Sequence, residues 1–328
     1  MELSSLGLGT YLGEPTAEAD EGYAAAARAF FGAGGTVFDT AANYRGGRSE
    51  RALGMAFAGL PRDGFFVSTK AGYLPMGDGT DEDPRQWFQR VLEGPGILSA
   101  SEVVDGCHAL TPRYLAHQLE VSRAALGLEA VDLFHLHNPE QQLPHLGPDA
   151  FYAAVTRAFE ACEGFVQAGK IRAYGVATWN GFRVPPGRPD HLSLERLLAA
   201  ATDIGGRGHH FRWIQLPLNL ALTEAFLAPT QTFLGERMTP LRAAGAAGLS
   251  VQTSASIMQA RILMQLPEDL VEALGGSTPA QAALQFTRSC PGVIVALCGM
   301  GRPEHAQENA AVLALPKVDT AVLEGLFG

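Results

Sequence analysis

The chain has 328 residues, of which 47% are hydrophobic and 18% charged, so its composition excludes an intrinsically disordered protein. The formal net charge of -10 argues against nucleic acid or an anionic membrane surface as the main partner. The four cysteines form no C-x-x-C pair, the N-terminus has no signal-peptide pattern, and no apolar run approaches the ~20 residues of a membrane-spanning helix. We therefore expect a cytoplasmic protein.

Eight short apolar segments have the composition of strands. The first and weakest is LGLGTYLG at 6–13, and the others cover 36–41, 65–71, 131–137, 171–179, 211–219, 249–256 and 293–300. Near-continuous hydrophobicity is typical of strands that are buried on both faces, as in a parallel sheet. The sequence therefore predicts a parallel sheet.

Helix signals fill the intervals between these strands. The Ala-rich segment 17–33 has acids in its first turn, 111–127 opens on Thr-Pro and ends at a glycine, and 149–169 and 277–290 follow later. About eight strand–helix repeats without an early glycine fingerprint predict an α/β fold, a (β/α)8 TIM barrel that forms a single domain over residues 1–328. The long connections 72–110 and 220–236 would follow the third and sixth strands, at the face where barrels build active sites, and we expect lids or substrate walls there.

Four polar residues lie at or just after predicted strand ends. Asp39 ends one strand and Tyr44 follows five residues later, while Lys70 and His137 lie at the ends of two others. A lysine ammonium near a phenol favours the phenolate, so we expect Lys70 to lower the pKa of Tyr44 while Asp39 holds Lys70 in place. Each residue also has a purely structural interpretation: a buried ion pair for Asp39 and Lys70, and packing for Tyr44 and His137.

The run FDTAANY at 38–44, followed by SE at 49–50 and LG at 53–54, resembles the aldo-keto reductase superfamily. Segments that end in Lys70 and His137, and the later runs KIRAYGVA, STPAQAALQF and GRPEHAQEN, resemble the same family in the same order. The resemblance implies an oxidoreductase with Asp39, Tyr44, Lys70 and His137 as catalytic residues. Such an enzyme interconverts a carbonyl of a small molecule (aldehyde, ketone or sugar) and an alcohol with NAD(P)H, and Tyr44 is its general acid and base.

The same resemblance implies a dinucleotide that lies extended across the barrel mouth, although the chain has no G-x-G-x-x-G loop. The residues that it assigns to the cofactor are Thr178, Gln215, Ser254, Ser256, Arg302, Glu308 and Asn309. An arginine fork suits a 2′-phosphate, so Arg302 favours NADP(H) over NAD(H).

Two stretches depart from the family pattern at the nicotinamide end. The usual G-V-S-N is Gly-Val-Ala-Thr at 175–178, and the aromatic residue expected after the seventh strand is replaced by Thr253. These changes leave two alternatives open: a lyase, dehydratase or epimerase that uses the same four residues without net redox chemistry, and a nucleotide-sensing binding subunit without turnover.

Several further side chains are candidates for the site. His135 and His137 point to the same face of one strand, but no third ligand has a convincing spacing, so we expect a core histidine rather than a metal site. Apolar wall candidates are Tyr73, Trp87, Trp179 and Phe182. The sequence does not encode the substrate, the reaction direction or the oligomeric state.

Overall fold

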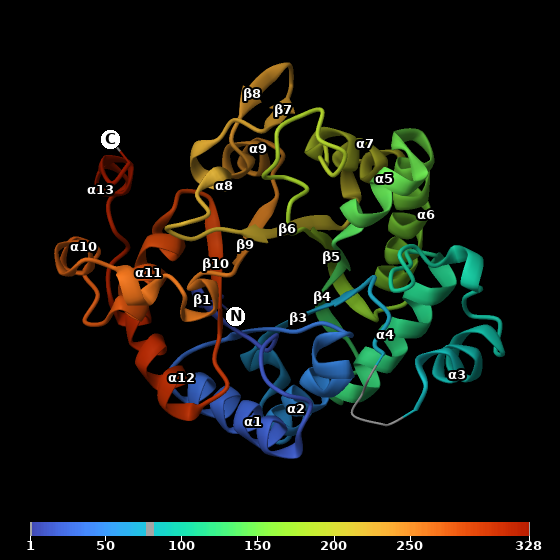
Figure 1. Cartoon of the computed structure of the whole chain (residues 1–328), viewed down its shortest axis with the longest axis horizontal. Coiled ribbons are helices and arrows are strands. Elements are labelled where there is room, and N and C mark those ends of the chain that lie inside the picture. The colour runs from blue at the N-terminus through green and yellow to red at the C-terminus, as the bar shows by residue number, and fades with distance from the viewer. Residues whose placement is uncertain (1, 77–81, 328) are drawn as a thin grey trace.

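In the computed structural model, which describes residues 2–76 and 82–327, eight parallel strands close into a barrel (Figure 1). In barrel order they are β1 (Leu6–Gly9), β2 (Val37–Asp39), β3 (Phe66–Ala71), β4 (Val131–His137), β5 (Ile171–Ala177), β6 (Phe211–Pro217), β9 (Ser250–Ser254) and β10 (Val293–Gly299). β10 pairs with β1 and completes the ring. The predicted strands and the (β/α)8 fold class are confirmed.

Helices surround the ring of strands (Figure 1). The helices that follow successive barrel strands are α1 (Ala17–Gly32), α2 (Arg48–Phe57), α4 (Pro112–Leu126), α6 (Pro148–Gln167), α7 (Leu194–Gly205), α9 (Pro240–Ala246), α11 (Pro279–Ser289) and α12 (Pro303–Ala310). Shorter elements decorate the connections: α3 (Pro84–Phe88), α5 (Leu143–Leu146), α8 (Glu224–Leu227), the hairpin of β7 (Gln231–Phe233) and β8 (Glu236–Met238), α10 (Glu268–Ala273) and α13 (Thr320–Gly325). No helix in the described ranges is long and apolar enough to cross a membrane.

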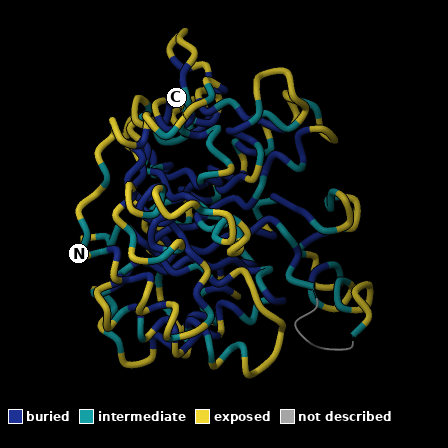
Figure 2. Tube along the Cα trace, turned by 60° about the vertical axis from the view of Figure 1, so that its left-hand side comes forward, coloured by how far each residue is buried: buried dark blue, intermediate teal, exposed yellow. Residues whose placement is uncertain are grey.

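Local chemistry explains where the predicted helices begin and end. The Thr111 side chain accepts a hydrogen bond from the Tyr114 backbone N–H at the start of α4, and Gly127 ends that helix with φ of +66°. Thr278 caps α11 in the same way, with proline at the first helical position. Buried residues concentrate in the strands and on the inner faces of the helices (Figure 2), so the core lies inside the barrel and between the barrel and its helices.

The long connections after β3 and β6 are present as predicted. The first has a small hydrophobic cluster of its own around Leu74, Leu92 and Leu98, and the second contains α8 and the β7–β8 hairpin. A third long connection, residues 255–278 after β9, was missed by the sequence analysis. It contains no glycine or proline before Pro267, so it lacks a loop signal, and the left-handed φ of +56° at Gln259 and +64° at Ala260 prevents a continuous helix there.

Candidate active site

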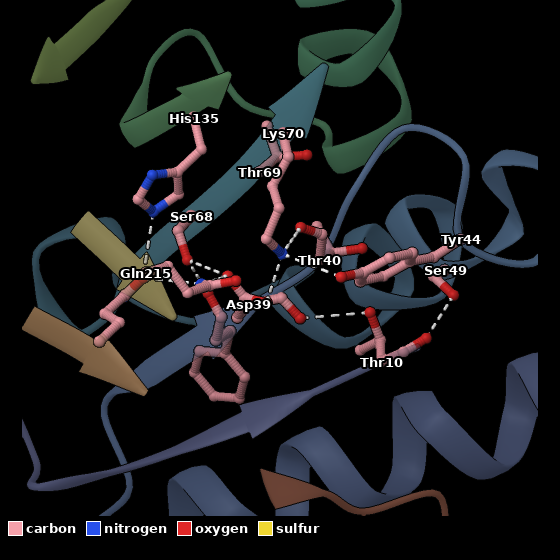
Figure 3. Close-up of polar contacts among 12 residues, drawn as sticks. Thr10, Asp39, Thr40, Tyr44, Ser49, Ser68, Thr69, Lys70, His135 and Gln215 are labelled. Atoms are coloured by element: carbon pink, nitrogen blue, oxygen red, sulfur yellow. Dashed lines mark hydrogen bonds and ion pairs between the residues drawn. The ribbon is translucent and has the colours of Figure 1, made fainter. Parts of the chain in front are cut away.

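Asp39, Lys70 and Tyr44 meet at the carboxyl ends of β2 and β3 (Figure 3). The Lys70 Nζ atom lies 2.6 Å from Asp39 Oδ2 and donates hydrogen bonds to the Thr40 carbonyl oxygen at 2.7 Å and to the Tyr44 hydroxyl at 3.3 Å. Tyr44 begins a short turn five residues beyond Asp39, the last residue of β2, and its backbone N–H donates a hydrogen bond to the Ala41 carbonyl oxygen. The turn thus places the phenol over the ammonium.

The Asp39 carboxylate is held from both sides. Its second oxygen, Oδ1, accepts hydrogen bonds from Ser68 Oγ at 2.7 Å and from Gln215 Nε2 at 3.0 Å. Lys70 is fully buried and Asp39 is 4% exposed, and a buried charge is tolerated only when it is paired and hydrogen-bonded. The ion pair therefore has one geometry and keeps the ammonium under the phenol.

The pKa shifts define the protonation states of these groups. Burial disfavours the Lys70 ammonium, but Asp39 and Tyr44 outweigh it, so the pKa of Lys70 is raised. Burial also raises the pKa of Tyr44, and the opposing effect of Lys70 does not overcome it. The predicted net lowering of the Tyr44 pKa is therefore wrong, because desolvation of the phenolate is the larger effect. At neutral pH Tyr44 is a phenol with a proton to donate.

His137 lies beside this group as a neutral imidazole. Its ring meets the Tyr44 ring edge-on, with centroids 5.7 Å apart, and burial together with the Lys70 charge holds the pKa of His137 well below its usual value. His108 supports His137 and was not among the candidates from the sequence. Its Nε2 is hydrogen-bonded to the His137 carbonyl oxygen at 2.7 Å. Gln142 Nε2 lies 3.1 Å from His108 Nδ1, so His108 carries its proton on Nε2 and fixes the end of β4.

Ser49 and Glu50 connect α2 to the segment after β1 and to β3, the strand that carries Lys70. Ser49 Oγ donates to the Thr10 carbonyl oxygen at 2.7 Å, and Thr69 Oγ1 donates to Glu50 Oε1. Glu50 is 1% exposed, and burial raises its pKa to about 7. The motif therefore positions the loop that carries Tyr44, a role that the spacing alone did not predict.

Replacing Glu50 with glutamine should stabilise the protein in a pH-dependent manner. The native state holds the Glu50 proton up to about pH 7, whereas the unfolded chain loses it near the ordinary glutamate pKa of 4.5, so this group lowers stability as pH rises between those values. The difference in free energy of unfolding between Glu50→Gln and wild type should grow by about 3 kcal/mol, in favour of the variant, as pH rises from 4.5 to 7. Above pH 7 the difference should stay constant. Urea unfolding across this range measures the difference.

Glu120→Gln is the matched control for this experiment. Glu120 lies on the surface, and its hydrogen bond with Lys170 lowers the pKa of its carboxyl group. Relative to wild type, the free energy of unfolding of Glu120→Gln should therefore change only slightly with pH, and in the direction opposite to that of Glu50→Gln. Equal pH dependence of both variants would contradict the account of Glu50.

A cavity of about 1350 Å³ opens at this end of the barrel, large enough for a dinucleotide together with a small substrate. Asp39, Tyr44 and His137 line it. The predicted cofactor residues Thr178, Gln215, Ser254, Ser256, Arg302, Glu308 and Asn309 all line the same cavity. Lys70 lies just beneath, against Asp39 and Tyr44.

Buried polar atoms in this wall lack partners, which supports a bound ligand. The hydroxyl oxygens of Thr178 and Ser256 are buried and make no hydrogen bond within the described residues. Gln215 Nε2 is bonded to Asp39 and Gln252, which leaves the amide oxygen of Gln215 for a ligand. The donor and acceptor set therefore fits the polar groups of a dinucleotide.

The walls of the cavity differ in part from the expected ones. Tyr73 and Trp179 line it as predicted, but Trp87 packs against the small cluster of the β3 connection, and Phe182 is fully buried in the main core. Apart from Tyr73, no described residue of the two predicted long loops lines the cavity. The missed connection does so instead, together with residues 9–14 after β1. Loop length alone therefore pointed to the wrong walls.

His135 is a core histidine, as expected. It is fully buried, its Nε2 lies 3.2 Å from Gln252 Oε1, and burial lowers its pKa to about 4. Among the described residues no group of three or more His, Cys, Asp or Glu side chains could hold a metal ion.

A match to a known protein family identifies the family of this chain. Residues 5–184 match the model of the Aldo/keto reductase family. The chain belongs to the aldo/keto reductase family. This result confirms the resemblance that the motifs at the strand ends indicated. The family consists of NAD(P)-dependent oxidoreductases.

The individual relatives of this chain have low sequence identity to it. A D-threo-aldose 1-dehydrogenase from a Pseudomonas species is 32% identical over 154 residues, but the match spans 44% of this chain and 40% of that dehydrogenase. A Schizosaccharomyces pombe protein named as a voltage-gated potassium channel β subunit is 24% identical over 88% of this chain and 78% of its own length. An aldo/keto reductase from Klebsiella pneumoniae, solved with NADP and acetate, has a TM-score of 0.66 and 23% identity, and the match covers 99% of this chain and 92% of that one. That similarity concerns the fold alone.

Proposed function

We propose that this chain is an NADP(H)-dependent oxidoreductase that interconverts the carbonyl group of a small molecule and the corresponding alcohol. The observation that carries the proposal is the hydrogen bond from the Lys70 ammonium to the Tyr44 phenol at the floor of a cavity of dinucleotide size. The bound nicotinamide supplies the hydride. The chain supplies the proton and the orientation of the reacting groups.

In the proposed reduction, the Tyr44 hydroxyl donates its proton to the carbonyl oxygen as negative charge develops there. Lys70 and Asp39 stabilise the resulting phenolate, because the ammonium lies 3.3 Å from the Tyr44 oxygen and is fixed by the carboxylate. Neutral His137 donates a hydrogen bond to the same substrate oxygen. Alcohol oxidation is the reverse, in which the phenolate accepts the proton.

Thr178 and Gln215 would hold the nicotinamide end, Ser254 and Ser256 the pyrophosphate, and Arg302, Glu308 and Asn309 the adenosine end. Arg302 is the one arginine or lysine among the described cavity-lining residues, and it directly precedes α12. A guanidinium at a helix N-terminus suits a phosphate, so we retain the preference for NADP(H) over NAD(H). We also retain the proposals of a cytoplasmic location and of one domain over residues 1–328.

Arg302→Ala should weaken NADPH binding and leave NADH binding unchanged. Loss of a charged hydrogen-bonding partner for the 2′-phosphate should raise the NADPH dissociation constant by about 10- to 100-fold. Titration of intrinsic tryptophan fluorescence with each cofactor measures both values. Arg261→Ala is the control, because Arg261 is exposed on the missed connection and does not line the cavity. Equal losses for NADPH and NADH would refute a contact with the 2′-phosphate.

The proposed function is tested with the purified protein, by cofactor titration and a screen of aldehydes, ketones and sugars for loss of nicotinamide absorbance. Binding with turnover supports the oxidoreductase. Absence of binding of either cofactor would overturn it and favour the lyase, dehydratase or epimerase.

A nucleotide-sensing subunit is the second candidate, and a specific observation favours it. The relative named as a potassium channel β subunit matches 88% of this chain. Tight cofactor binding without turnover of any carbonyl compound would support this candidate over the oxidoreductase.

A further inference from the structure

Trp179 is an exposed indole at the edge of the cavity. It follows β5, lines the cavity and is 48% exposed, although the large side chain of tryptophan is ordinarily well buried. A flat apolar surface in the cavity that Tyr44 also lines is suited to bind a flat apolar partner.

Glu140 holds the Trp179 backbone from below. Its Oε1 atom accepts hydrogen bonds from the backbone N–H groups of Trp179 at 2.8 Å, Asn180 at 3.1 Å and Gly181 at 3.3 Å. Glu140 lies just after β4, three residues beyond His137, and is 5% exposed. Three donors that converge on one buried carboxylate oxygen fix the start of the β5 connection relative to the strand that carries His137.

Arg183 holds Trp179 from the other side. Its Nε donates to the Trp179 carbonyl oxygen at 2.9 Å, and its guanidinium carbon lies 6.0 Å from the centroid of the indole ring. Glu224, at the start of α8, pairs with Arg183 at 2.9 Å. The backbone of Trp179 is therefore held by residues of the connections after β4 and β5, Arg183 is in turn paired with the connection after β6, and the Arg183 guanidinium is the contact that the indole ring makes among the described residues.

We propose that Trp179 is a specificity-determining platform for substrates with a ring, aromatic or sugar, next to the reacting carbonyl, and that Glu140 is its positioning residue. This inference rests on the proposed oxidoreductase function and adds the substrate class that the site selects. On this proposal, small linear carbonyl compounds lack the ring that would contact Trp179 and gain nothing from the platform. The backbone N–H of Thr178 is bonded to the Gln215 carbonyl oxygen and not to Glu140, so we expect changes at Glu140 to leave cofactor binding unaffected.

The test compares benzaldehyde, which carries a ring, with propanal, which does not, in steady-state reduction with NADPH. Trp179→Ala and Glu140→Ala should each raise KM for benzaldehyde about tenfold, the loss of roughly one stacking contact, with kcat changed less than about twofold. KM for propanal and the NADPH dissociation constant should not change. Glu140→Gln keeps a carbonyl acceptor for the three N–H groups and should fall between wild type and Glu140→Ala.

Matched controls separate positioning from general stability. Glu163 is another buried glutamate that accepts backbone and side-chain hydrogen bonds, from the His210 N–H at 2.6 Å and the Tyr174 hydroxyl at 3.0 Å, and it does not line the cavity. Glu163→Gln and Trp87→Ala should leave both KM values unchanged even if they lower the melting temperature. A readout without turnover is quenching of tryptophan fluorescence by benzyl alcohol in the NADPH complex, in which no hydride acceptor is present, and Trp179→Phe should alter this quenching while Trp87→Phe should not.

An unchanged KM for benzaldehyde in Trp179→Ala and Glu140→Gln would overturn the platform, and so would an equal rise for propanal. Should Glu140→Ala fail to fold, those two variants still decide the question. Turnover of neither aldehyde by the wild-type protein, nor of any other carbonyl compound, would instead overturn the proposed function, and the inference with it.

Discussion

Tyr44→Phe should lower kcat for carbonyl reduction by about 100- to 10,000-fold, the usual contribution of a positioned general acid. The reason is that no other phenol lies within hydrogen-bond distance of Lys70 among the described residues, and phenylalanine removes the proton while keeping the ring. NADPH binding and the melting temperature should remain close to wild type, because within the described residues the Tyr44 hydroxyl has one hydrogen bond, from Lys70 at 3.3 Å. Steady-state kinetics and a fluorescence titration measure the two properties separately.

Tyr11→Phe is the matched control. Tyr11 lines the same cavity and its ring meets that of Tyr44 edge-on, with centroids 5.1 Å apart, but its hydroxyl makes no hydrogen bond in the described part of the chain. This variant should keep kcat within about threefold of wild type, since no proton transfer is removed. A wild-type rate for Tyr44→Phe, or an equal loss for both variants, would remove Tyr44 from the role of proton donor.

Lys70→Met should reduce kcat by at least about 100-fold and also destabilise the protein by about 3–5 kcal/mol. The activity falls because the developing phenolate loses its ammonium partner. The stability falls because the Asp39 carboxylate, 4% exposed, is left without a counter-charge. Kinetics and urea unfolding at the same pH report the two losses.

The double variant Lys70→Met/Asp39→Asn separates these two effects. It removes both buried charges, and Ser68 and Gln215 can still donate to the asparagine oxygen. Much of the lost stability should return, while activity should not. Recovery of activity along with stability would mean that the ion pair has only the structural role that the sequence left open.

Much of the fold follows from short-range patterns. β4 is buried along its whole length, and its mostly apolar sequence was a sufficient signal for a strand. The Thr111 cap and Gly127 define α4 by local chemistry. The connection after β9 was missed because its conformation depends on residues such as Gln259 that adopt a left-handed φ without being glycine. A non-glycine residue with a left-handed φ leaves no local signature in the sequence.

The catalytic candidates were predictable to a different degree. Strand ends in a parallel barrel converge, so the positions of Asp39, Lys70 and His137 alone indicated a common site. The direction of the Tyr44 pKa shift was not predictable, because it depends on the balance between one nearby charge and the extent of desolvation, which only coordinates supply. The supporting residues His108 and Glu140 were missed for a related reason: each acts on a backbone group of another element.

The most direct test of the central claim follows the transferred hydrogen. NADPH carrying two deuterium atoms at nicotinamide carbon 4 is incubated with the protein and a carbonyl compound from the screen, and the alcohol product is examined by NMR. We expect one deuterium on the former carbonyl carbon in the wild type and a rate lower by about 100-fold or more in Tyr44→Phe. An alcohol product without deuterium, or full deuterium transfer at the wild-type rate in Tyr44→Phe, would contradict it.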